Sequence, residues 1–245
     1  CMNLIGILFE SKKNQFDLIH TMLPSLLSKL AIKNSINQFI HLSALGIESA
    51  TDSNYAMSKL EGEKRVRKNF PDAIILKPSI VYSVDDNFTT NFMSLLNILP
   101  VMPLYYGGKT KFTPIHVSDI SNIIYETVQK KILGQTIECV GPQVLTFKEM
   151  IIKILKAIKK KRLLLPIPFA LAKLNAKIFE LMPKPLLTMD QLRLLKYDNV
   201  TSRKYKNNFD FNMKANKIFD DEINRYSFNW TSGGQFSKRK VDNQN

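Results

Sequence analysis

The chain has 245 residues, of which 44% are apolar, and this suits one large α/β domain with a sizeable core. Its two cysteines form no CxxC pair or histidine cluster, so we expect no disulfide framework and no metal site. No run of about 18 apolar residues occurs, which excludes a membrane-spanning helix. The formal charge of +14 favours anionic partners, unless it only reflects a lysine-rich, solvated surface. Basic and aromatic residues do not interleave on one face, so we expect no specific nucleic-acid partner.

Strands and helices are predicted to alternate along the first 160 residues. This alternation is typical of βα units and predicts an α/β fold with a mostly parallel sheet. The predicted strands cover residues 2–8, 38–43, 73–77, 112–117 and 136–140, and the predicted helices cover 15–33, 54–69, 89–99, a segment beginning near 118, and 146–158.

Three local signals refine these elements. Pro24 lies inside the helix predicted over 15–33 and should kink or split it. Pro78 follows a buried strand and cannot continue a central ladder. Thr146, followed three residues later by Glu149, predicts a capping box at the start of a helix.

The composition changes after residue 160. A basic run at 159–162 precedes an apolar stretch over 163–182, in which we expect a helix from about Phe169. We therefore divide the chain into a domain over 1–160, a small, mostly helical part over 161–230 and a disordered tail over 231–245. Two interpretations of the basic run stay open, because it suits either anionic lipid or a solvated helix end. Its residues, with the preceding lysine, are Lys156, Lys159, Lys160, Lys161 and Arg162.

Tyr55 and Lys59 form a YxxxK step near the start of the helix over 54–69. A spacing of four places the phenol and the ammonium on one helical face. A nearby ammonium favours phenolate and lowers the tyrosine pKa, so we expect Tyr55 to exchange a proton with a substrate oxygen. Lys59 could also hold a ribose hydroxyl of a dinucleotide, and Ser43 ends the strand that lies a short loop upstream.

The order of these motifs resembles the extended and atypical short-chain dehydrogenases/reductases, the NAD-dependent epimerase/dehydratase family. A strand ending in Ser43 precedes the YxxxK helix, and a strand running into Lys77-Pro78-Ser79-Ile80-Val81-Tyr82 follows it. Further stretches resemble the subgroup that contains the nucleotide-binding accessory subunit of respiratory complex I. They are Asn3-Leu4-Ile5-Gly6, residues 39–46, Gly107-Gly108-Lys109-Thr110 and residues 114–120. The resemblance covers about residues 2–160.

The resemblance implies a Rossmann-like doubly wound sheet and an NAD(P) cofactor, with NADP(H) preferred. The catalytic residues that it implies are Tyr55, Lys59 and Ser43, and the cofactor-binding residues are Asn3, Leu42, Tyr55, Lys59, Pro78, Ser79, Ile80 and Val81. Family members open with a strand, a GxxGxxG turn and a helix, and that turn holds the pyrophosphate. This sequence contains no such turn, so we expect the sheet to be truncated by its first three strands, roughly 70 to 90 residues.

One departure from the family bears on activity. Ala44 occupies the position of the usual catalytic hydroxyl, which favours a structural nucleotide over turnover. We therefore expect an accessory or assembly component of NADH:quinone oxidoreductase, partnered by complex I subunits. It would be cytoplasmic, peripheral on the inner face of the respiratory membrane. The alternatives are an active NAD(P)-dependent oxidoreductase or nucleotide-sugar epimerase/dehydratase that uses Tyr55 and Lys59, and a decayed chain whose open sheet edge prevents stable folding.

Overall fold

The computed structural model describes residues 1–168, 173 and 187–236, and its centre is a parallel sheet. Each strand in the order β1-β2-β3-β8-β11 runs parallel to its neighbour, which confirms the predicted α/β sheet. The strands are β1 (Met2–Asn3), β2 (Ile40–Leu42), β3 (Ile74–Pro78), β8 (Thr136–Cys139) and β11 (Lys206–Asn207).

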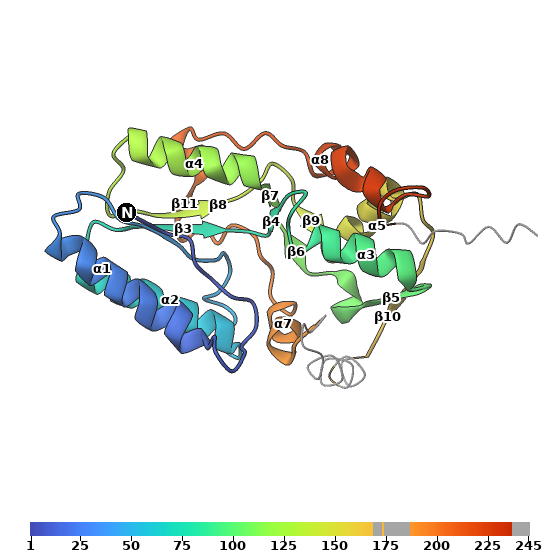
Figure 1. Cartoon of the computed structure of the whole chain (residues 1–245), viewed down its shortest axis with the longest axis horizontal. Helices are drawn as coiled ribbons and strands as arrows, with labels where there is room; N and C mark the ends of the chain where they lie inside the picture. The colour runs from blue at the N-terminus through green and yellow to red at the C-terminus, as the bar shows by residue number, and fades with distance from the viewer. Residues whose placement is uncertain (169–172, 174–186, 237–245) are drawn as a thin grey trace, which may run out of the picture.

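Helices cover both faces of this sheet, as in a doubly wound fold (Figure 1). On one face lie the π-helix η1 (Asp17–Met22) and the helices α1 (Leu23–Lys33) and α2 (Asn54–Asn69), and α4 (Val117–Gln129) lies on the other. Alternate strand residues serve the two faces. Phe39 packs with Val66 of α2 in one cluster, whereas Ile40 packs with Ile123 of α4 in another.

Helices α3 (Thr89–Ile98), α5 (Phe147–Ala157) and α8 (Phe219–Tyr226) share a second apolar core beside the sheet (Figure 1). Short strand pairs surround it: β4 (Val81–Tyr82) with β7 (Ile115–His116), β6 (Lys111–Phe112) with β9 (Leu145–Thr146), and β5 (Val101–Leu104) with β10 (Leu163–Pro166). The remaining described helices are η2 (Tyr105–Gly108), α7 (Met189–Leu194), η3 (Asn208–Phe211) and η4 (Ser227–Trp230). Among the described helices, none combines the length and apolar character that a membrane span requires.

The helix predicted over 15–33 is split, as Pro24 predicts. Pro24 lies in the first turn of α1, directly after the π-helical segment η1. Proline has no backbone N–H to donate to the carbonyl of His20 four residues earlier, so the regular ladder is interrupted there. Gly62 of α2 lies against that carbonyl: a Cβ at position 62 would come within 1.9 Å of the His20 oxygen. The two helical segments therefore approach each other closely only because residue 62 is glycine.

Two predicted strands are shorter or divided. The strand expected over 2–8 ends at Asn3, whose side-chain Oδ1 accepts a hydrogen bond from the Ile5 nitrogen and turns the chain. The strand expected over 112–117 is divided into β6 and β7 around Pro114, which cannot donate to a ladder. The capping box of Thr146 and Glu149 is confirmed.

The part after residue 160 is mostly helical in its described elements, but it also supplies strands to two sheets. Strand β10 pairs with β5, and β11 joins the central sheet beside β8. The helix expected from Phe169 and the tail beyond residue 236 lie outside the described residues.

Candidate functional site

The carboxyl ends of β1, β2 and β3 meet at one edge of the sheet. These strands are parallel neighbours, with Asn3 opposite His41 and Leu42 opposite Leu76. In open parallel sheets, ligands bind at this edge. The register therefore gathers there most of the residues that the sequence predicts for a site.

Lys59 is the most suitable ligand-binding group at this edge. Its side chain is 4% exposed, and its Nζ donates to the Leu42 carbonyl at 3.2 Å. An ammonium has three N–H donors, and this is the one hydrogen bond that the described residues offer it. Burial lowers the pKa of Lys59 to about 8, although Glu63 opposes the shift. Lys59 therefore retains donor capacity for a further acceptor.

Tyr55 lies one turn before Lys59 on α2, packed among other rings. Its ring meets the His20 ring edge-on with centroids 5.2 Å apart, and the Phe16 ring at 5.8 Å. Burial, and then the carboxylate of Asp190, raises the pKa of Tyr55 to about 12. The prediction that Lys59 lowers this pKa is therefore wrong, because burial disfavours the phenolate. The phenol remains protonated at neutral pH.

Ser43 belongs to a buried ionic network. Its hydroxyl donates a short hydrogen bond to the carboxylate of Glu63. Glu63 binds the Lys77 ammonium at 2.8 Å, and Glu48 binds the same ammonium at 2.6 Å. Lys77 is fully buried, so these carboxylates compensate its charge. Ala44 packs with Tyr55 against a small apolar cluster. Within the described residues, no hydrogen bond joins the predicted catalytic hydroxyl of Ser43 to Tyr55.

His20 enters the site from η1, which the sequence did not indicate. Its Nε2 accepts from the Ile7 nitrogen at 3.1 Å. The Ser58 hydroxyl donates to the Tyr55 carbonyl, so it accepts from His20 Nδ1 at 3.0 Å. Burial, and then the Lys59 charge, lowers the pKa of His20 to about 3. A neutral His20 thus contacts the start of α2 through Ser58. His20 lies 35 positions before Tyr55, so no local sequence pattern predicts their contact.

Asn3 is turned into the protein. Its Nδ2 donates to His41 Nδ1 at 3.1 Å, and its side chain is 1% exposed. Burial, and then the Lys59 charge, lowers the pKa of His41 to about 3, and its Nε2 has no hydrogen-bond partner in the described part of the chain. Both polar atoms of Asn3 are thus engaged within the protein, and its cofactor role stays a prediction.

The segment Pro78-Ser79-Ile80-Val81 is held to the C-terminal part of the chain. The Pro78 carbonyl accepts from the Leu45 nitrogen at 2.9 Å. The Ser79 hydroxyl donates to Asn199 Oδ1 at 2.5 Å, and Asn199 Nδ2 donates to the Leu45 carbonyl at 2.6 Å. Ile80 and Val81 continue into β4. Asn199, which the sequence reasoning missed, therefore joins the loops that follow β2 and β3.

Asp190 of α7 caps the helix that carries Tyr55 and Lys59. Its Oδ1 accepts from the Asn54 nitrogen at 2.8 Å. Its Oδ2 accepts from the Tyr55 nitrogen at 3.0 Å and from the Ser53 hydroxyl at 2.8 Å. A carboxylate stabilises the positive end of a helix dipole. The C-terminal part of the chain thus orients the first turn of α2.

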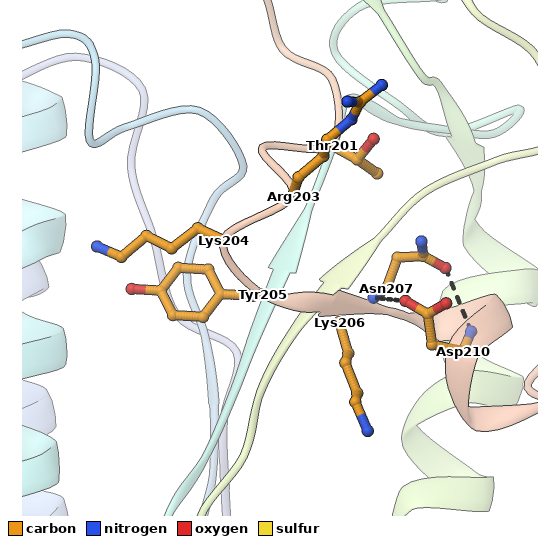
Figure 2. A pocket seen from close by; sticks show the side chains of 7 residues that line it. All are labelled: Thr201, Arg203, Lys204, Tyr205, Lys206, Asn207 and Asp210. Atoms are coloured by element: carbon orange, nitrogen blue, oxygen red, sulfur yellow. Dashed lines mark hydrogen bonds between the residues drawn. The ribbon is translucent and has the colours of Figure 1, made fainter.

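A described pocket lies away from this edge of the sheet. It has a volume of about 600 Å³ and follows the sheet edge at β11. Figure 2 shows that its lining comes from one continuous segment, in which Asn207 and Asp210 are hydrogen-bonded to each other. The lining residues are Thr201, Arg203, Lys204, Tyr205, Lys206, Asn207 and Asp210. This pocket contains none of the predicted site residues, and it contacts the buried network through Tyr205, whose ring centroid lies 5.5 Å from Lys77 Nζ.

Comparisons with known proteins relate the chain to two groups, although no family model matches it. It is 28% identical over 201 residues to mitochondrial NADH dehydrogenase [ubiquinone] 1 alpha subcomplex subunit 9 of Mus musculus. The aligned region covers 81% of this chain and 53% of that relative. It is 24% identical over 200 residues to the mitochondrial NADH-ubiquinone oxidoreductase 40 kDa subunit of Neurospora crassa, covering 81% and 52%. The chain spans about half the length of these curated relatives.

Among solved structures, a UDP-glucuronic acid 4-epimerase from Bacillus cereus, determined with UDP-glucuronic acid and NAD, shares the fold with a TM-score of 0.61. It is 16% identical, and the match covers 89% of this chain and 70% of the epimerase.

Proposed function

We propose that this chain, which has the extended short-chain dehydrogenase fold and distant homology to the 40 kDa subunit of respiratory complex I, is a nucleotide-binding accessory component of an NADH:quinone oxidoreductase. The buried Lys59 ammonium carries this proposal. It lies at the carboxyl edge of the sheet with one hydrogen bond to Leu42. A cationic donor at this edge suits the hydroxyls and phosphates of a dinucleotide.

The residues around Lys59 fit the nicotinamide and ribose end of NAD(P). A Cβ added at Gly6 would come 3.2 Å from Lys59 Nζ and 3.8 Å from His20 Nε2, so bare backbone faces the ammonium. Lys59 would bind ribose hydroxyls, and the Leu42 carbonyl beside it would accept from the ligand. When bound, NAD(P) supplies hydride chemistry. The sequence has no GxxGxxG turn for the pyrophosphate, so the proposed contacts cover one half of the nucleotide, and a preference for NADP(H) stays a prediction.

The protonation of Tyr55 and the hydrogen bonding of Ser43 favour a structural nucleotide over catalytic turnover. Burial raises the pKa of Tyr55 to about 12, so the phenol stays protonated near neutral pH and its phenolate is less accessible as a proton acceptor than in an ordinary tyrosine. Ser43 donates to Glu63 within a buried ionic network, and Ala44 supplies no hydroxyl. The binding lysine therefore remains, while the groups for proton transfer are not poised for it.

Equilibrium binding of NADH and NADPH to Lys59→Met tests the nucleotide proposal. A hydrogen bond to a charged donor contributes about 1.5–3 kcal/mol, so binding should weaken by roughly 10- to 100-fold. Lys64→Met is the matched control, because Lys64 is an exposed lysine on the same helix. Equal affinities of Lys59→Met and the unchanged chain would refute a nucleotide contact at Lys59.

An active NAD(P)-dependent oxidoreductase or nucleotide-sugar epimerase/dehydratase is the second candidate. The observation in its favour is that Tyr55 and Lys59 lie one turn apart on α2, in a fold shared with a UDP-glucuronic acid 4-epimerase. Steady NAD(P)H turnover that is lost in Tyr55→Phe would establish it. Nucleotide binding without turnover on a panel of sugar nucleotides and carbonyls would support the structural role.

The proposed partners are subunits of NADH:quinone oxidoreductase at the respiratory membrane. The relatives from Mus musculus and Neurospora crassa are named as mitochondrial subunits of that enzyme. The matched region covers 81% of this chain, so it includes residues of both the central sheet and the C-terminal part. This supports a related assembly role for the chain.

A further inference from the structure

A surface beside the second core combines exposed aliphatic side chains with a run of cations. We call it the β5–β10 surface. Its apolar part is the outer face of the parallel pair β5 and β10, where Val101 lies opposite Leu163. Val101, Leu163 and Leu165 are 37%, 57% and 41% exposed. Leu163 and Leu165 are two positions apart, so they share one face of the strand, while Leu164 between them packs on the second core.

One residue at the end of α3 and one in the middle of α5 extend this apolar area. Ile98, the last residue of α3, is 62% exposed, and Ile152 of α5 is 45% exposed. Large aliphatic side chains exposed together mark an interaction surface more strongly than the same residues scattered singly. The five aliphatic residues of the β5–β10 surface come from four elements that the fold brings together.

The cations line a groove that includes Ile152 of this apolar area and that reaches β10 at Leu164, next in sequence to Leu163 and Leu165. The groove has a volume of about 530 Å³, and its floor and rim are Ile152, Leu155, Lys156, Lys159, Lys160, Lys161, Arg162 and Leu164. No acidic residue lines it. Within the described part of the chain, its four lysines take part in no ion pair.

Arg162 fixes the position of the basic run. Its Nε donates to the Leu96 carbonyl at 2.7 Å, and one of its terminal nitrogens donates to the Asn97 carbonyl at 3.2 Å. These carbonyls lie at the C-terminal end of α3, where a cation is stabilised by the helix dipole. The lysines of the run therefore stand on a turn that is bonded to α3, next to the exposed Ile98.

We propose that the β5–β10 surface docks on the face of an anionic phospholipid bilayer. The lysines would lie among the headgroup phosphates, and Ile98, Leu163 and Leu165 would insert at the boundary with the acyl chains. A bilayer fits this surface better than an acidic protein does. Protein interfaces are depleted in lysine and enriched in aromatic residues, whereas four lysines and no aromatic residue line this groove.

Cosedimentation of the whole chain with vesicles tests this inference, and it does not depend on nucleotide binding. One vesicle is phosphatidylcholine alone, and the other is equimolar phosphatidylcholine and phosphatidylglycerol. We expect binding to the anionic vesicle alone, weakened by added salt. The triple variant K159Q/K160Q/K161Q should bind roughly 100-fold more weakly, because each lysine near an anionic surface contributes roughly fivefold.

Two further variants distinguish binding through the β5–β10 surface from binding through the net charge of the whole chain. K64Q/K68Q/K131Q removes the same charge from exposed lysines elsewhere and should bind as the unchanged chain does. L163Q/L165Q keeps all cations and should also weaken binding, since both leucines are exposed and their replacement leaves the core intact. The inference is overturned if the anionic vesicle is not bound. It is also overturned if both lysine triples weaken binding equally, or if the surface binds only an acidic protein.

Discussion

The Asp190 carboxylate accepts a hydrogen bond from the Tyr55 backbone nitrogen at 3.0 Å, although 135 positions separate the two residues in the chain. The same carboxylate accepts from Asn54 and Ser53, and the Ser53 hydroxyl accepts from the Ala56 nitrogen, so Asp190 and Ser53 together cap the first turn of α2. It also contributes to the raised pKa of Tyr55. The C-terminal part of the chain therefore controls both the position and the protonation of the tyrosine.

Asp190→Asn should lower the pKa of Tyr55 and destabilise the fold by about 1–2 kcal/mol. The pKa falls because a negative charge near the phenol is removed, and stability falls because a charged helix cap is weakened. Spectroscopic titration of the tyrosines and urea unfolding measure the two effects. Asp52→Asn is the control, since Asp52 is exposed and bonds to the Tyr197 hydroxyl. An unchanged Tyr55 titration in Asp190→Asn would contradict the assignment.

Gly62→Ala should destabilise the protein by at least about 2 kcal/mol. In an ordinary helix interior, replacing glycine by alanine stabilises by about 1 kcal/mol, so the opposite sign is diagnostic. The added Cβ would meet the His20 carbonyl at 1.9 Å and push η1 away from α2. Urea unfolding gives the value, and Lys64→Ala, at an exposed position of α2, serves as the control. A stabilised Gly62→Ala would show that the two helical segments do not pack this closely.

Glu63→Gln should cost about 3 kcal/mol of stability, because the fully buried Lys77 ammonium loses a charged partner at 2.8 Å. Replacing both residues in E63Q/K77M should restore most of that loss, since no buried charge then lacks compensation. Glu61→Gln on the same helix, where Glu61 is half-exposed and pairs with Arg65 at 2.9 Å, should change stability by less than about 0.5 kcal/mol. The network has no such role if the single and double variants are equally unstable.

Stability should fall as the pH drops below about 6.5. The pKa values of His20 and His41 are both lowered to about 3 in the folded chain, from 6.5 when unfolded. Below pH 6.5 the unfolded chain binds protons that the folded chain does not bind, so each histidine removes about 1.4 kcal/mol of stability per pH unit down to about pH 3. Above pH 7 neither contributes a slope. Urea midpoints between pH 8 and pH 5 measure the effect. His41→Gln should roughly halve the slope, because His20 still contributes; an unchanged slope in that variant would contradict the assignment.

Local patterns in the sequence predicted much of the fold. The helix predicted over 54–69 has those bounds in the structure, and the capping box at Thr146 is present. Both depend on periodicity and on contacts three or four residues apart. Strand β11, in contrast, consists of Lys206 and Asn207, which show no apolar alternation. It forms because β8 offers a parallel partner, and no local pattern records that.

The placement of Tyr55 and Lys59 was predictable from the sequence, but the pKa of Tyr55 was not, and the roles of the proposed site residues stay predictions. The YxxxK spacing correctly placed Tyr55 and Lys59 on one helix next to Leu42. The wrong expectation for the Tyr55 pKa arose because burial under His20 and the charge of Asp190 come from distant segments. Such contacts leave no signal within a window of sequence.

Comigration with NADH:quinone oxidoreductase tests the central proposal most directly. Respiratory membranes from cells that make the protein at its native level would be solubilised gently and separated on a native gel. The account predicts that the chain migrates with the assembled enzyme or with one of its assembly intermediates, and that it remains there after a salt wash. If the chain runs separately from every form of the enzyme, the accessory role is contradicted, even if the chain still binds nucleotide or anionic vesicles.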